Sequence, residues 1–99
     1  MKTEDLKKTK EIIQRILKLM VAGVIIIDIP KNIAYINADK CWLEKDENYK
    51  TNFCNSIILY CSIQKAERYN HRKKFKFVPQ DNKKIVLASV YRKEVKINL

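Results

Sequence analysis

The stretch GVIIIDIPKNIAYIN, residues Gly23 to Asn37, decides how this chain folds. Two short runs rich in β-branched and apolar residues, 24–27 and 33–36, flank a polar break that contains Pro30 and Asn32. Proline presets φ for a turn, and asparagine tolerates a positive φ better than most residues. The pattern therefore predicts a β-hairpin.

The first of these runs is apolar on both of its faces. Side chains alternate across a strand, so Val24 and Ile26 face one side while Ile25 and Ile27 face the other. A strand of this kind is typical of a sheet that is covered on both faces. We therefore expect a layer on each side of the sheet.

The totals indicate a single folded domain spanning residues 1–99. The chain is 46% apolar and holds one glycine and two prolines, a composition typical of a globular protein. Its net charge of +10 favours acidic partners: nucleic acid, an anionic membrane or an acidic protein segment. The longest apolar run, 19–27, is about half of a membrane span. We expect a cytoplasmic protein with no membrane partner.

No pattern in the chain indicates catalysis, a metal or a cofactor. The three cysteines, Cys41, Cys54 and Cys61, form no CxxC motif, and the single histidine, His71, is distant in sequence from all of them. We expect the thiols to be small buried side chains. No pair of carboxylates lies among apolar residues, and no glycine-rich loop could hold a phosphate. The expectation is a protein that is not an enzyme.

Two helices are predicted from the apolar spacing. The first begins at Thr3, ends near Gly23 and carries apolar residues along one face. The second begins at Thr51 or Asn52 and continues for about eighteen residues. Its apolar positions cover most of its circumference, which indicates burial on more than one side. We infer that the sheet covers one side and the same helix of a second subunit covers another.

The C-terminal third predicts three strands. KKFKFVP, residues 73–79, alternates, with Phe75 and Phe77 pointing inward, and IVLASVY and EVKINL follow the turn QDNKK. The predicted order is α-β-β-α-β-β-β. This order describes an α/β (α+β) fold in which a five-stranded, mostly antiparallel sheet lies between helices.

In pattern, spacing and element order, nearly the whole chain resembles the roadblock family of dynein light chains. The segments that carry the resemblance are LKKTKEIIQRILKLMVAG, GVIIIDIPKNIAYIN, YKTNFCNSIILYCSIQKAER and KKFKFVPQDNKKIVLASVYRKEVKIN. The chain departs from the family at the hairpin turn, where Pro30, Lys31 and Asn32 replace the usual glycine. Its basic charge is not a family trait either.

The resemblance implies a dimer in which the long second helices pack together and the third strands meet edge to edge. It makes six residues candidate dimer contacts: Cys54, Ile58, Cys61, Lys65, Phe75 and Phe77. On the first helix, Ile12, Ile13, Ile16 and Met20 are the candidate partner-binding residues. The implied function is that of a non-catalytic light chain, a homodimer or a heterodimer with a related light chain. It would bind helical segments of dynein intermediate chains in a cytoplasmic or axonemal, microtubule-associated motor.

Two alternatives stay open. Roadblock-like domains also act as scaffolds or regulators of small GTPases, which keeps the fold and changes the partner. The segment NHRKKFKF, residues 70–77, suggests nucleic-acid binding, with Tyr69, Phe75 and Phe77 as stacking rings. This second alternative is less favoured, because the two phenylalanines alternate with lysines as in a half-buried strand.

Overall fold

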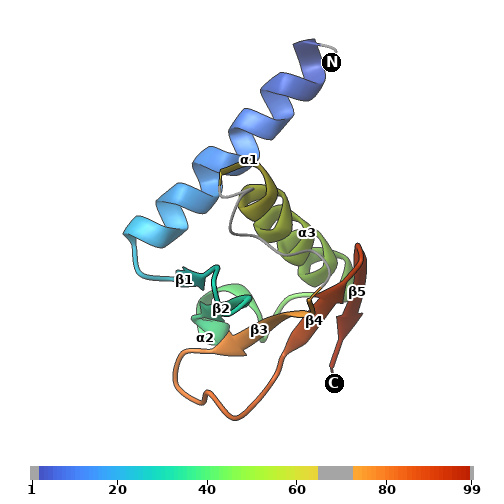
Figure 1. Ribbon diagram of the computed structural model, residues 1–99. Coiled ribbons are helices and arrows are strands. Elements are labelled where there is room, and N and C mark those ends of the chain that lie inside the picture. Colours follow the sequence, from blue (N-terminus) through green and yellow to red (C-terminus); the bar gives the residue numbers. More distant parts are fainter. Residues whose placement is uncertain (1–2, 65–72, 99) are drawn as a thin grey trace.

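The computed structural model describes residues 3–64 and 73–98 and forms a five-stranded sheet with helices (Figure 1). The predicted α/β class and element order are confirmed, and one short helix is added. The elements are α1 (Thr3–Val21), β1 (Ile25–Asp28), β2 (Ile33–Ile36), α2 (Ala38–Cys41), α3 (Glu47–Gln64), β3 (Phe75–Pro79), β4 (Ala88–Tyr91) and β5 (Glu94–Ile97).

Side-chain caps explain where α2 and α3 begin. Asn37 Oδ1 accepts a hydrogen bond from the N–H of Lys40 at 3.3 Å and starts α2 in a segment predicted to be a connection. Asp46 Oδ1 accepts from the N–H of Tyr49 at 2.8 Å, and α3 begins at Glu47. The predicted start at Thr51 or Asn52 was therefore about one turn late, because an equally good cap lies upstream.

The sheet order is β1-β2-β3-β4-β5, with every pair antiparallel except β2 and β3. The predicted β1–β2 hairpin is confirmed, and Asn32 takes φ 54° in its turn. The third strand lies at the centre of the sheet, hydrogen-bonded to β2 on one edge and to β4 on the other. The implied edge-to-edge contact of two third strands is therefore not available in this strand order.

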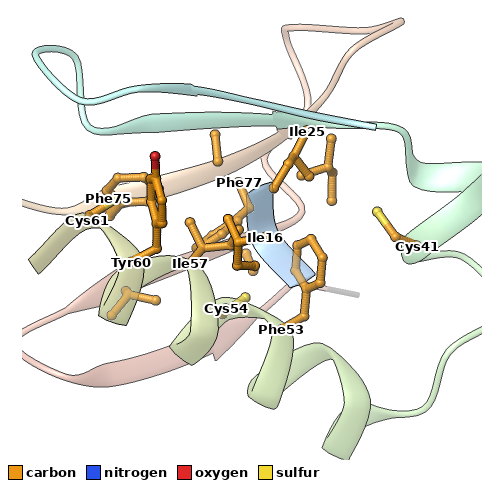
Figure 2. Close-up of a cluster of buried hydrophobic side chains, with 14 of the residues drawn as sticks. Ile16, Ile25, Cys41, Phe53, Cys54, Ile57, Tyr60, Cys61, Phe75 and Phe77 are labelled. Carbon is orange, nitrogen blue, oxygen red and sulfur yellow. The ribbon is translucent and has the colours of Figure 1, made fainter. Parts of the chain in front are cut away.

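One face of the sheet forms the core together with α1 and α3 (Figure 2). The cluster joins Ile16 of α1 and Ile57 of α3 to Phe75 and Phe77 of β3, whose ring centroids lie 5.3 Å apart. Strand register brings the other inward residues onto the same face: Ile25, Ile27, Ala34, Ile36, Ala88, Val90, Val95 and Ile97. Both long helices in the described residues thus pack against the same face of the sheet.

Neither of the two long helices in the described residues packs against the opposite face, which we call the open face, and this corrects the expectation of a layer on each side. Two side chains on the open face, Val78 and Ser89, are nevertheless only 4% and 8% exposed. Ile26, which points to that face, is 55% exposed, whereas its neighbour Ile25 is 1% exposed. Strand β1 lies at the edge of the sheet rather than inside it. Val24 precedes the strand, and its N–H donates to the carbonyl of Leu19 at 2.9 Å at the end of α1. Apolar residues on both faces of a short run therefore do not require two covering layers, since single exposed apolar side chains are common.

Matched substitutions of adjacent isoleucines test this one-sided packing. We expect Ile25→Val to lower the free energy of unfolding by about 1 kcal/mol, because it removes a buried methylene group. Ile26→Val should change it by less than about 0.5 kcal/mol, since that side chain is largely exposed. Urea denaturation followed by circular dichroism measures both. An equal cost at the two positions would show that both faces of β1 are covered.

Candidate functional site

Most of the residues predicted to contact a second subunit are instead buried within a single chain. Four of the six have no exposed surface with which to meet a second copy: Cys54, Cys61, Phe75 and Phe77. Ile58 is half-buried, packs against the core and keeps some exposed surface. Lys65 lies outside the described residues. Of the predicted set that the structure describes, only Ile58 offers surface to a partner.

Helix α1 accounts for part of the apolar circumference of α3 that was assigned to a second subunit. The two helices cross and pack against each other (Figure 1). Ile16 at this side of α1 is 2% exposed and belongs to the same core cluster as Cys54 and Ile57. The sheet, α1 and α3 of one chain thus meet in a single core. This core buries side chains of α3 that were predicted to contact a second subunit.

The predicted partner-binding residues of α1 also point inward. Ile16 is buried, while Ile12, Ile13 and Met20 are half-buried and pack against the core. Their positions leave little surface for another protein. This face of α1 therefore packs against the sheet and α3 of its own chain.

A second apolar stripe on α1 faces solvent and was missed. Leu6, Leu17 and Val21 are 54%, 43% and 90% exposed. Their spacings of eleven and four residues place them on one side of a helix with 3.6 residues per turn. We call these three residues the outer stripe. Sequence reasoning had assigned all apolar residues of α1 to one face, whereas their angular spread is wide enough for two.

Further exposed apolar side chains lie on and near α3. Tyr49 is 42% and Ile63 is 48% exposed, and Leu43, between α2 and α3, is 60% exposed. A hollow of about 300 Å3 opens between the end of α1, strand β1 and α3, where it is lined by Met20, Ile26, Ile29, Pro30 and Tyr60. Together with the outer stripe, these features make the helical side a candidate protein-interaction site.

The cysteines are held as unreactive thiols. Burial raises the pKa of Cys54 and of Cys61 to about 12, and it raises the pKa of Cys41 to about 11 despite the nearby Lys45 cation. A thiol with so high a pKa is almost entirely protonated near neutral pH and is a poor nucleophile or metal ligand. The residues described hold no group of three or more His, Cys, Asp or Glu side chains placed to bind a metal ion.

Comparison of the chain with protein-family models, curated proteins and solved structures gives no match. The resemblance to the roadblock family therefore stays a prediction from the sequence pattern. None of the helices in the described part of the chain has the length and apolar character needed to cross a membrane. Functional proposals for this protein must accordingly rest on its own surfaces.

The raised thiol pKa values predict an alkaline loss of stability. Above the ordinary thiol pKa of 9.0 the unfolded chain loses protons that the folded chain keeps up to about pH 12, so the free energy of unfolding falls as pH rises. Cys54 and Cys61 should each contribute a slope on the order of 1 kcal/mol per pH unit.

Urea titrations between about pH 9 and 10 measure this slope, with the Cys54→Ala/Cys61→Ala double variant as the control. The double variant should be less stable at neutral pH because of its cavities, yet it should show a shallower dependence on pH. Equal slopes in the two proteins would contradict the burial of these thiols.

Proposed function

We propose that the protein is a non-catalytic scaffold subunit of the roadblock dynein light-chain type. It pairs with a second light chain and holds a helical segment of a dynein intermediate chain. The observation that carries the proposal is the outer stripe of α1, an exposed apolar edge that adjoins the face packed into the core and includes one cation, Lys10, between Leu6 and Leu17. The element order, which matches the order implied by the resemblance, supports it.

The outer stripe fits a partner helix better than a small ligand. Helix α1 has nineteen residues and is therefore about 28 Å long, and its N-terminal half extends away from the sheet (Figure 1). An amphipathic partner helix lying along it would cover Leu6, Leu17 and Val21 in turn. Complete burial of such side chains stabilises a complex by about 1.5–3 kcal/mol each, less here because they are already partly covered.

A single stripe of this size supports weak binding, and pairing of two subunits would strengthen it. Two stripes that engage two helical segments of one assembly bind with an avidity above that of either site. The central position of β3 means that pairing would use the helical side, where Ile58 and Ile63 of α3 keep exposed surface.

Affinity purification from the native cell tests the partner. We expect dynein intermediate and heavy chains to accompany the wild-type protein and to be lost with Leu17→Glu, which places a charge in the apolar contact. Lys8→Gln is the matched control, because Lys8 is exposed on another side of the same helix and the substitution alters the charge by the same amount. A folded wild-type protein that recovers no dynein chain would overturn the proposal.

Light scattering tests pairing at micromolar concentration. The wild-type protein should show about twice the chain mass of 11.8 kDa. Ile63→Glu should give the monomer mass, because a charge there would lie unpaired in the contact. Ile85→Glu is the control: that isoleucine is 47% exposed, against 48% for Ile63, and lies in the β3–β4 connection. A monomeric wild-type protein, or equal effects of the two variants, would refute pairing through α3.

A further inference from the structure

In the part of the chain that the structure describes, most of the excess positive charge lies in residues 73–98, which form β3, β4, β5 and their connections. Residues 3–64 hold nine Lys or Arg and eight Asp or Glu, whereas residues 73–98 hold eight Lys or Arg and two Asp or Glu. All eight of these C-terminal cations are exposed. A general enrichment in lysine would spread over both parts of the chain. The segregation instead indicates a surface with its own partner.

The strand register places several of these cations on the open face of the sheet. Lys76 of β3, Ser89 of β4 and Lys96 of β5 form one row, in which Lys76 pairs with Ser89 and Ser89 pairs with Lys96. The two lysines therefore lie two strand spacings apart, about 10 Å, on either side of a small hydroxyl residue. Such a row presents two cations at a distance that suits neighbouring negative groups of one polyanion.

Tyrosine rings lie on the same face. Tyr91 is 42% exposed, and the guanidinium carbon of Arg92 lies 5.3 Å from its ring centroid. Tyr35 of β2 is half-buried, and Lys83 Nζ lies 5.3 Å from its ring centroid. A hollow of about 340 Å3 runs over β4 and β5 and is lined by Lys74, Ser89, Tyr91, Glu94 and Lys96. The hollow thus brings the ring of Tyr91 together with the ammonium groups of Lys74 and Lys96, and Glu94 adds one carboxylate at its edge.

The β4–β5 turn keeps its cations in an unfavourable backbone conformation. Arg92 and Lys93 take φ values of 49° and 69°. A two-residue hairpin turn with positive φ at both positions favours Asn and Gly, and other residues are strained there. Turn geometry alone does not explain a pair of basic residues at this point, whereas binding to an anion does.

From these observations we propose that the open face of the sheet binds single-stranded nucleic acid. The lysine row and the turn cations contact phosphates, and a base stacks on Tyr91, as in other single-strand binders that combine a basic groove with aromatic platforms. An acidic peptide would satisfy the cations but offers no flat ring to stack on the exposed Tyr91. A duplex reader inserts a helix or a two-stranded ribbon into a groove, whereas Lys76 and Lys96 lie on the face of a five-stranded sheet. This surface lies across the sheet from the helical site and does not depend on the proposed light-chain function.

Fluorescence anisotropy with labelled oligothymidylate and oligouridylate of about 12 nucleotides tests the proposal, at several salt concentrations. We expect binding that weakens with salt, with a log–log slope of about −0.7 for each phosphate contacted. Lys76→Glu/Lys96→Glu should weaken it more than tenfold. Lys8→Glu/Lys18→Glu is the matched control, because it makes the same charge change at exposed positions of α1 and should weaken binding less than threefold.

Two further variants separate a binding role from a structural one. Tyr91→Ala should weaken binding about tenfold by removing a stacking face. Arg92→Asn/Lys93→Gly should raise the thermal stability of the protein, because both residues suit the turn, and should still weaken binding severalfold. A variant that is more stable and binds less cannot be explained by misfolding.

Two competitors complete the design, an oligoglutamate peptide of similar charge and a duplex of the same length, each compared with a sample that contains no competitor. Failure of peptide and duplex to displace the oligonucleotide supports the proposal. Displacement by the peptide at equal concentration would assign the face to an acidic protein instead. Preference for the duplex, equal effects of the two lysine double variants, or no binding at low salt would each overturn it.

Discussion

The packing of Phe75 and Phe77 against the helices is the contact on which the rest of the structure depends. Both rings have no exposed surface, and they share one core with Ile57 of α3 and Ile16 of α1 (Figure 2). Strand β3, which carries them, is also the only strand that joins the β1–β2 hairpin to the β4–β5 hairpin. The alternation that sends the phenylalanines inward sends Lys76 outward. Core packing and the basic open face are therefore two consequences of one strand.

Local sequence patterns predicted every element except the short helix α2, but they did not predict which strands lie side by side. Periodicity in Leu6 to Met20 and alternation in Phe75 to Phe77 depend only on nearby residues, and both predicted the observed element. Alternation reports which face a residue occupies but not which strand lies beside it. The central place of β3, the parallel pairing with β2 and the edge position of β1 are set by the path of α3 between β2 and β3.

The candidate surfaces were predictable to a smaller extent for the same reason. The sequence shows that a helical residue is apolar. It does not show whether that residue packs against the sheet, a neighbouring helix or a partner protein. The resemblance implied that Cys54 and Cys61 contact a second subunit, and nothing in the sequence showed that α1 packs against α3 inside one chain. The uneven division of charge was present in the sequence, but it gained meaning only when the register put Lys76 and Lys96 in one row.

The division of charge is also compatible with the proposed self-association of a protein whose net charge is +10. Two copies that met through their open faces would bring together the surplus of six positive charges that each carries in residues 73–98, and repulsion would oppose them. Residues 3–64, which include α1 and α3, have a surplus of only one, so helical surfaces can approach without that penalty. Edge pairing is restrained as well, because β1 is four residues long and β5 carries Glu94 and Lys96 along its exposed side. Protein partners on the helical side and a polyanion on the open side would consequently bind without competing for the same surface.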